Sequence, residues 1–281
     1  MLGTMENDML DVTDNALPDY KAISIERAND GIDWLTLNRP DKLNAMNAEL
    51  CGELRDYFGS LLDNHAVRVV ILRGAGRHFC AGFDFDEMDS LIGGGPKALR
   101  TQRTISEIIM RMRRCPQPII ALVHGAAAGG GFGLALAADI RYAAHSARMS
   151  VAMARIGVTG CDIGISYFLP RAVGTSNAAE LMMTGRPIDA ENALRISLVS
   201  AVVDDNLLDD TARELANDML VMSPLALRLT KEGLNTAQDA GSLEAVIALE
   251  DRGQILCIAA GHMEEGVAAF QENRPAHYID E

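Results

Sequence analysis

The sequence predicts an α/β fold with a helical C-terminal region, on the basis of two observations. Apolar runs typical of buried strands alternate with loops and amphipathic helices up to residue 204. From residue 206 onward the apolar residues follow only the helical period. We therefore expect a flexible leader at 1–19, a core at 20–204 and a helical oligomerisation region at 205–281.

The strands are predicted from β-rich apolar segments of four to seven residues. They are Ala22–Glu26, Ile32–Asn38, Val67–Leu72, Ile119–Val123, Ile140–Ala143 and Val199–Val203. The turn residues Asn29-Asp30-Gly31 indicate that the first two form a hairpin.

Helices are predicted where apolar residues recur at helical spacing. Those of the core are Ala45–Asn64, Leu99–Cys115, Phe132–Ala138, Ile163–Val173 and Asn177–Thr184. Those of the C-terminal region are Leu207–Val221, Pro224–Thr236, Leu243–Ala260 and Met263–Asn273. The apolar stripes of this last group exceed what a few helices bury among themselves, which favours packing against other subunits.

Composition excludes several classes of protein. The 281 residues include 25 Lys and Arg against 39 Asp and Glu, a net charge of −14, and no basic face for a nucleic acid is apparent. The hydrophobic content of 48% is too high for a disordered chain. The longest apolar stretch, Pro118–Ile140, contains five glycines, so we predict a buried strand, a loop and a helix there rather than a membrane span.

Cysteine and histidine spacing gives no support for a metal site. The five cysteines include no C-x-x-C pair, and the six histidines show no ligand spacing. We expect small buried thiols in a reducing compartment and, because Met1–Asp19 lacks the pattern of a secretory signal, a cytoplasmic protein. The segment Gly93–Lys97 resembles a phosphate loop but follows no strand, so we expect a flexible linker.

Two glycine segments remain as candidates for chemistry. Cys80–Asp84 ends a strand in small residues, and Gly129–Gly131 opens a helix whose first N–H groups lack intrahelical partners. Two convergent backbone N–H groups suit the stabilisation of an oxyanion or enolate formed from a carbonyl. Each segment taken alone is equally compatible with a tight turn.

Together with their neighbours, these segments resemble a known family. The ordered motifs are Asn38–Asn47, Phe79–Asp84, His124–Gly131, Phe168–Gly174, Leu181–Gly185 and Glu265–Phe270. In this order they look like the enoyl-CoA hydratase/isomerase (crotonase) superfamily, over nearly the whole chain from Lys21 onward.

The resemblance implies a fold, a ligand and a site. It implies a crotonase-like spiral of ββα units with a C-terminal trimerisation region, forming a homotrimer or a dimer of trimers. The ligand is an acyl-CoA thioester, with no separate cofactor, whose carbonyl oxygen is held by the N–H groups at Phe83 and Gly130. The residues implied in substrate or CoA binding are Lys42, Leu43, Ala45, Ala81, Phe83, Asp84, Phe85, Gly130, Gly133, Met153 and, from a neighbouring subunit, Phe270.

Several positions differ from the family pattern, and these differences limit the reactions that the site is expected to catalyse. Hydratases of this family carry one glutamate after the glycine run and a second further along, and these positions are Gly133 and Met153 here. Neither residue can transfer a proton. A lysine that often faces CoA is replaced by Asp86, while Asp84 belongs to the family's Ala-Gly-x-Asp pattern and is expected to hold the loop shape.

Asp162 is the candidate acid/base. Its position matches the active-site aspartate of dienoyl-CoA isomerases and of a chlorobenzoyl-CoA dehalogenase. The dehalogenase also needs a histidine in the helix before the glycine run, and Leu99–Cys115 contains none, so dehalogenation is disfavoured. The isomerases pair their aspartate with two further acids at the positions that are Gly133 and Met153 here, so their scheme is also incomplete in this chain. The other interpretation is that Asp162 is the N-cap of the helix Ile163–Val173.

Two hypotheses about function follow. The first is an acyl-CoA enzyme of the hydratase/isomerase type that stabilises a thioester enolate and uses Asp162, with isomerisation and hydrolysis as variants of this chemistry. The second is a non-catalytic acyl-CoA-binding protein that has lost both glutamates. Apolar candidates for the acyl pocket are Met88, Leu91, Met153 and Phe168.

Overall fold

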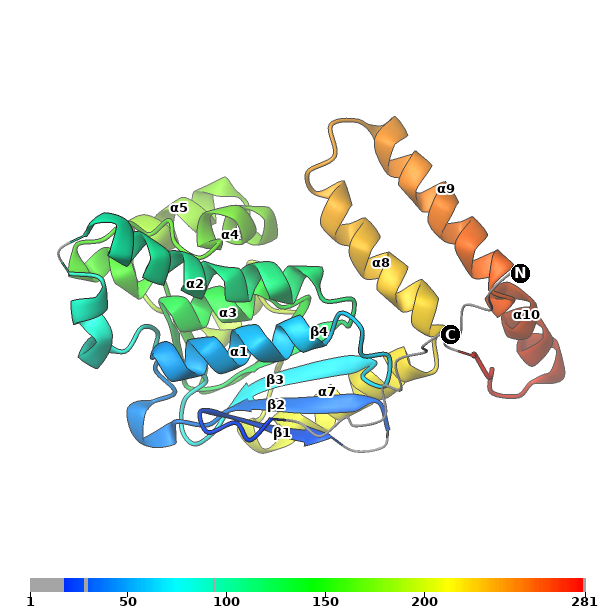
Figure 1. The fold of residues 1–281 in the computed structure, drawn as a ribbon, viewed down its shortest axis with the longest axis horizontal. Helices are drawn as coiled ribbons and strands as arrows, with labels where there is room; N and C mark the ends of the chain where they lie inside the picture. Colours follow the sequence, from blue (N-terminus) through cyan, green and yellow to red (C-terminus); the bar gives the residue numbers. More distant parts are fainter. Residues whose placement is uncertain (1–17, 28–29, 93, 280–281) are drawn as a thin grey trace, which may run out of the picture.

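The computed structural model describes residues 18–27, 30–92 and 94–279 (Figure 1). The predicted leader therefore lies outside the described residues except for Pro18 and Asp19, and the hairpin turn is described only from Asp30. The predicted α/β fold is confirmed, with helices on both faces of a central sheet.

The central sheet has six strands in the order β1-β2-β3-β4-β6-β9. Strands β1 and β2 form the predicted antiparallel hairpin, in which Ile23 is opposite Leu37, and every following pair in this sheet is parallel. The strands are β1 (Ile23–Arg27), β2 (Ile32–Leu37), β3 (Val69–Gly74), β4 (Ile119–Val123), β6 (Ile140–Ala144) and β9 (Ala201–Val203).

A second, three-stranded sheet was not predicted. Its strands are β5 (Ala126–Ala128), β7 (Arg148–Ser150) and β8 (Ile188–Asp189), with β7 in the middle. These strands are two or three residues long, and β5 consists of alanines between glycines. Too short to show an alternating pattern, they form only because tertiary contacts bring their backbones together.

The side chains of the sheet alternate between two hydrophobic clusters, as the period of a strand requires. Leu35, Val70 and Leu72 belong to the larger cluster, under α1, α2 and α3. Trp34, Val69 and Ile71 belong to the smaller cluster, which α7 covers with Leu208, Ala212 and Ala216. Figure 1 shows α1, α2 and α3 on one side of the sheet and α7 on the other.

The helices keep most predicted positions. They are α1 (Ala48–Ser60), α2 (Gly95–Arg114), α3 (Gly130–Ala137), α4 (Ile165–Val173), α5 (Thr175–Thr184), α6 (Ala190–Arg195), α7 (Leu208–Leu220), α8 (Pro224–Ala237), α9 (Leu243–Ala259) and α10 (His262–Glu272). Four 3-10 turns are η1 (Pro40–Lys42), η2 (Phe85–Ser90), η3 (Ala152–Ile156) and η4 (Asp205–Leu207).

Two sequence predictions about local structure are wrong. The segment expected to be a flexible linker instead contains the start of α2, which begins at Gly95. Pro96 is tolerated there because the first N–H groups of a helix have no intrahelical acceptor. The cysteines are not uniformly buried: Cys51, Cys80 and Cys115 are, but Cys161 is exposed and Cys257 is half-buried.

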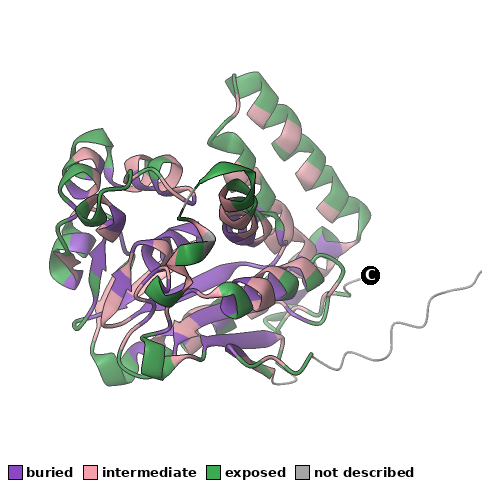
Figure 2. Ribbon diagram, turned by 60° about the vertical axis from the view of Figure 1, so that its left-hand side comes forward, coloured by how far each residue is buried: buried purple, intermediate pink, exposed green. Residues whose placement is uncertain are grey.

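Helices α8, α9 and α10 form an arm that projects from the core (Figure 1). None of the described residues of α9 is buried, and Figure 2 shows its helix as a mixture of exposed and half-buried residues while the strands are buried. No helix among the described residues is long and apolar enough to cross a membrane.

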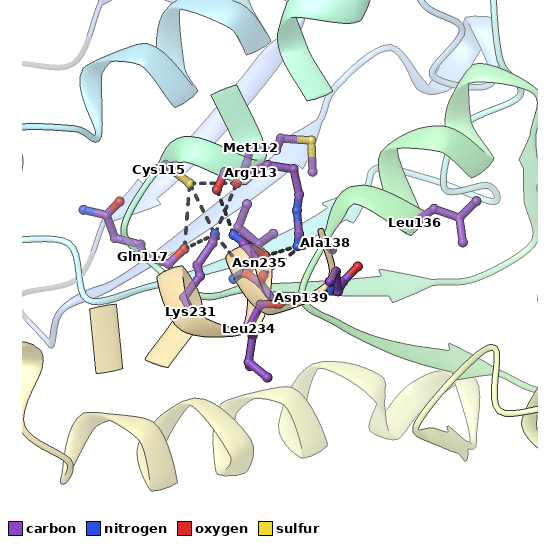
Figure 3. A network of polar contacts seen from close by, with 12 residues as sticks. Met112, Arg113, Cys115, Gln117, Leu136, Ala138, Asp139, Lys231, Leu234 and Asn235 are labelled. Carbon is purple, nitrogen blue, oxygen red and sulfur yellow. Dashed lines mark hydrogen bonds and ion pairs between the residues drawn. The ribbon is translucent and has the colours of Figure 1, made fainter. Parts of the chain in front are cut away.

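A buried lysine joins this arm to the core (Figure 3). The ammonium group of Lys231, on α8, lies 2.9 Å from a carboxylate oxygen of Asp139 and donates to the carbonyl oxygens of Gln117 at 2.7 Å and Met112 at 3.2 Å. Asn235, one turn further along, donates to the carbonyl oxygen of Arg113 at 3.0 Å. Since a buried charge needs such partners, these contacts fix the position of α8 against the end of α2.

Candidate active site

The two glycine segments singled out in the sequence lie side by side. Cys80 pairs with Ala127 in a parallel bridge, and its N–H donates to the carbonyl oxygen of Ala126 at 3.0 Å. Gly82 follows with φ +100°, and a Cβ there would lie 2.7 Å from the carbonyl oxygen of Ala128 and 3.4 Å from the nitrogen of Gly130. Only glycine fits this close approach, so the backbone after Gly82 lies next to the first turn of α3.

Two backbone N–H groups at this junction have no hydrogen-bond partner among the described residues. In the described part of the chain, no hydrogen bond uses the N–H of Phe83 or of Gly130. Gly130 is the first residue of α3, where an N–H has no intrahelical acceptor. An unpaired donor at a helix N-terminus favours a negatively charged oxygen, and the role of Phe83 and Gly130 in holding one stays a prediction.

The segment around Asn44 fixes the loop after β3. The side-chain amide of Asn44, which is fully buried, donates to the carbonyl oxygens of Ala75 at 2.9 Å and His78 at 2.8 Å. The Ala81 N–H donates to the carbonyl oxygen of Leu43 at 3.0 Å. Because of these contacts, the two predicted CoA-binding segments, Lys42–Ala45 and Ala81–Asp86, run next to each other.

Asp84 holds the shape of this loop. One of its carboxylate oxygens lies 2.9 Å from the Arg39 guanidinium, and the other accepts the Asp86 N–H at 3.1 Å. Burial by itself raises the pKa of Asp84, but the hydrogen bonds from Arg39 and from the Asp86 N–H outweigh it, so this pKa lies below its usual value. Asp84 is therefore committed to an ion pair, and Arg39, to which the sequence analysis assigned no role, is its partner.

The outer edge of the loop exposes the other candidate CoA contacts. The Lys42 ammonium lies 2.9 Å from the Asp86 carboxylate, and both side chains are exposed. Leu43 and Phe85 are exposed apolar residues, whereas Ala45 and Ala81 are half-buried. Phe270 is also exposed, but it belongs to α10, which lies in the arm and apart from these segments (Figure 1).

Asp162 is not the N-cap that the sequence allowed. Helix α4 begins at Ile165 with Gly164 as its cap residue. One carboxylate oxygen of Asp162, Oδ1, instead accepts the N–H of Ile163 at 2.8 Å and the side-chain amide of Gln102 at 2.5 Å. Burial raises the pKa of Asp162, and these two hydrogen bonds lower it by less, so the pKa lies above its usual value.

The space beside Gly133, where the family resemblance predicts the position of a hydratase glutamate, is filled by another side chain. A Cβ on Gly133 would lie 2.4 Å from Cδ1 of Ile163, and a Cβ on Gly130 would lie 3.7 Å from the same atom. Ile163 is buried and has φ +34°, a backbone conformation that β-branched residues rarely adopt. The strained loop therefore places Ile163 against Gly133 and next to the unpaired N–H of Gly130.

Met153, at the position that the resemblance predicts for a second glutamate, is an apolar side chain. Met153 is buried, and its Cε is 3.9 Å from the place of a Cβ on Gly129. The structure thus brings Gly133, Met153, Ile163 and the glycine run together. Asp162 precedes Ile163 in the chain and therefore lies beside this group. None of the described His, Cys, Asp and Glu residues form a group of three that could hold a metal ion.

The fold is that of a known enzyme family. The chain matches the family model described as enoyl-CoA hydratase/isomerase over residues 27–281, so it belongs to the crotonase superfamily, and the resemblance seen in its motifs is confirmed. A crystal structure of an enoyl-CoA hydratase from Bacillus anthracis superposes with a TM-score of 0.87 and 33% identity over 93% of this chain and 100% of that one. The predicted crotonase-like fold is therefore confirmed.

Curated relatives give the same result. The "Probable enoyl-CoA hydratase EchA12" of Mycobacterium tuberculosis is 39% identical over 265 residues, 92% of this chain and 93% of the relative. The 1,2-epoxyphenylacetyl-CoA isomerase of Escherichia coli is 34% identical over 88% of this chain and 95% of the relative. The chain is thus an enzyme of the hydratase/isomerase type.

Proposed function

We propose that this protein processes an acyl-CoA thioester by moving a proton within its acyl group, an isomerisation, with Asp162 as the acid/base. The single observation that supports it best is a carboxylate without a cationic partner, Asp162, whose neighbour in the chain, Ile163, packs against Gly130 and its unpaired N–H. Coenzyme A enters as part of the substrate, and no separate cofactor is required.

The proposed reaction begins with polarisation of the thioester. Its carbonyl oxygen accepts hydrogen bonds from the N–H groups of Phe83 and Gly130, which acidifies the neighbouring C–H group. Asp162 removes a proton from one carbon, and the negative charge collects on the oxygen as an enolate. Return of the proton to a different carbon completes the shift of the double bond. One carboxylate is sufficient, since the same group acts first as base and then as acid.

Isomerisation is favoured over hydration by the filled space at Gly133. Hydration needs a water molecule held by carboxylates, and the two positions that would supply them are Gly133 and Met153. A glutamate that had been lost without further change would leave a void, whereas Ile163 occupies this space. Relatives that are 34% identical include proteins named 1,2-epoxyphenylacetyl-CoA isomerase and Delta(3,5)-Delta(2,4)-dienoyl-CoA isomerase, so isomerases as well as hydratases are among the similar proteins.

Different residues would contact the CoA portion and the acyl portion of the substrate. Lys42, Leu43, Ala45, Ala81 and Phe85 would flank the CoA portion, with Asp84 supporting the loop through Arg39. Apolar residues, namely Met88, Leu91, Met153 and Phe168, would line the acyl portion.

We also propose that the chain acts as a homo-oligomer, a trimer or a dimer of trimers. The arm leaves large apolar side chains exposed on its helices, and contact with other subunits would bury them. They include Leu234, Leu243, Ile255, Leu256 and Phe270. In such an assembly Phe270 would approach the CoA of a neighbouring subunit.

The test is the substitution Asp162→Asn, which keeps the shape and removes the base. Turnover of 3-enoyl-, 2-enoyl- and dienoyl-CoA thioesters is followed spectrophotometrically, and binding is followed by calorimetry. We expect turnover to fall by roughly 10²–10⁴-fold while CoA thioester affinity stays unchanged. Unchanged turnover in the variant would remove Asp162 from the mechanism. Binding without turnover in the unaltered protein would favour the second hypothesis, a non-catalytic acyl-CoA-binding protein.

A further inference from the structure

The two oxygens of the Asp162 carboxylate have different surroundings. Oδ1 accepts both of its hydrogen bonds, from the Ile163 N–H and from the side-chain amide of Gln102. In the described part of the chain no hydrogen bond or ion pair uses Oδ2. Because a carboxylate is planar, holding one oxygen with two donors fixes the direction of the other.

Gln102 reaches Asp162 from a separate part of the fold. It lies on α2, 60 residues before Asp162, in line with Ile105 and Ile109 on the face of the helix that packs on the core. Cγ2 of Ile109 lies 3.5 Å from the place of a Cβ on Gly164, so α2 lies against the loop of Asp162. Gln102 is thus a polar residue at the end of an otherwise apolar stripe, and its side-chain amide donates to the Asp162 carboxylate.

Among the described residues, no charged group contributes to the shift in the pKa of Asp162. Helix α3, on the other side of the loop, has no titratable side chain. On α2, Glu107 lies within ion-pair distance of Arg111, and on α4 the Tyr167 hydroxyl donates to Asp239 at 2.6 Å. Burial and the hydrogen bonds from Ile163 and Gln102 are the influences on the pKa of Asp162. Of these, only the Gln102 hydrogen bond comes from a side chain.

We infer that Gln102 is a positioning residue, which holds Oδ1 of Asp162 so that Oδ2 is the oxygen that exchanges protons with the substrate. This inference rests on the proposed function, in which Asp162 is the acid/base. The Gln102 amide donates to the charged carboxylate and favours its ionised form, the form that acts as a base. Gln102 itself takes no part in proton transfer.

The test compares two substitutions with opposite expected effects. Gln102→Met keeps the length of the side chain and removes the donor, so kcat falls about tenfold and the acidic limb of the kcat/KM profile moves to higher pH. Gln102→Lys supplies a charged donor, so the same limb moves to lower pH. KM stays unchanged in both. Gln238→Met, the same chemical change at an exposed position at the end of α8, is the control and leaves the profile unchanged.

A second measurement separates this inference from the proposed function. Carboxyl NMR, with Asp162→Asn to assign the signal, gives the pKa of Asp162 without any substrate. Opposite shifts in the Met and Lys variants, together with a loss of turnover in Asp162→Asn, support the inference. Opposite shifts with turnover kept in Asp162→Asn would mean that the proposed function has failed and that Gln102 positions a carboxylate with no catalytic role. An unchanged or equally shifted pKa in both variants, or a loss of activity confined to KM, would overturn the inference whether or not Asp162 is catalytic.

Discussion

Asp84 and Asp162 are carboxylates in two loops that both lie against Gly130, and their surroundings differ. Asp84 forms an ion pair with Arg39 and accepts a backbone N–H, so its pKa lies below the usual value. Asp162 is partly buried and accepts hydrogen bonds only from uncharged donors, so its pKa lies above the usual value for an aspartate. A carboxylate with a cationic partner is stabilised in its charged form and supports structure. One without such a partner retains basicity, which a proton-transfer role requires.

Removing the partner of Asp84 tests the structural half of this comparison and has the largest expected effect on stability. Arg39→Met leaves the Asp84 carboxylate, whose side chain is 8% exposed, without its cation. We expect the free energy of unfolding to fall by about 2 kcal/mol, measured by urea denaturation. Arg55→Met, at an exposed pair with Asp56, is the matched control with little expected change. Equal effects of the two substitutions would contradict a structural role for Asp84.

Removing the charge of Asp162 tests the second half of the comparison, and here we expect the free energy of unfolding to rise rather than fall. The pKa of Asp162 in the folded protein lies above 3.8, the usual value, so its ionisation at neutral pH lowers the stability of the fold. This loss of stability disappears as the pH falls below the pKa of Asp162 in both the folded and the unfolded chain. We expect Asp162→Asn to raise the free energy of unfolding at pH 7 by about 0.5 kcal/mol, since water still screens part of the carboxylate. The gain should shrink toward pH 4.

The same pH series gives the contrasting result for Asp84. Its lowered pKa means that its ion pair stabilises the fold at neutral pH and that this contribution is lost as the pH falls through that pKa. Urea denaturation of Asp84→Asn should therefore show a loss of stability at pH 7 that narrows in acid. If both asparagine variants were destabilised at pH 7, the contrast between the two loops would not hold.

Charge reversal at Asp86 has the smallest expected effect on stability. The Lys42–Asp86 pair is exposed, so Asp86→Lys should leave the midpoint of thermal unfolding unchanged. It frees Lys42 and adds a cation where the family often has a lysine, and we expect roughly fivefold tighter binding of CoA by calorimetry at low salt. Weaker or unchanged binding would place the CoA phosphates away from this edge of the loop.

Local patterns in the sequence were sufficient for much of the fold. The strands of the central sheet and most helices followed from apolar periodicity, because burial against one or two faces imposes a period of its own on each element. The glycine segments and the ordered motifs led to Phe83 and Gly130 as the proposed donors, since the requirement for glycine is local. The short strands β5, β7 and β8 lack any such period, and only the tertiary structure shows them.

The sequence by itself determined the α/β class, the family and the absence of carboxylates at positions 133 and 153. Only the tertiary structure decided what surrounds the remaining carboxylate. The sequence analysis did not single out Gln102, and it treated Ile163 only as the first residue of a predicted helix. In the structure, Gln102 holds Asp162 and Ile163 fills the space at Gly133. The physical reason is that hydrogen bonds and close packing depend on distances between segments far apart in the chain, which no local pattern contains.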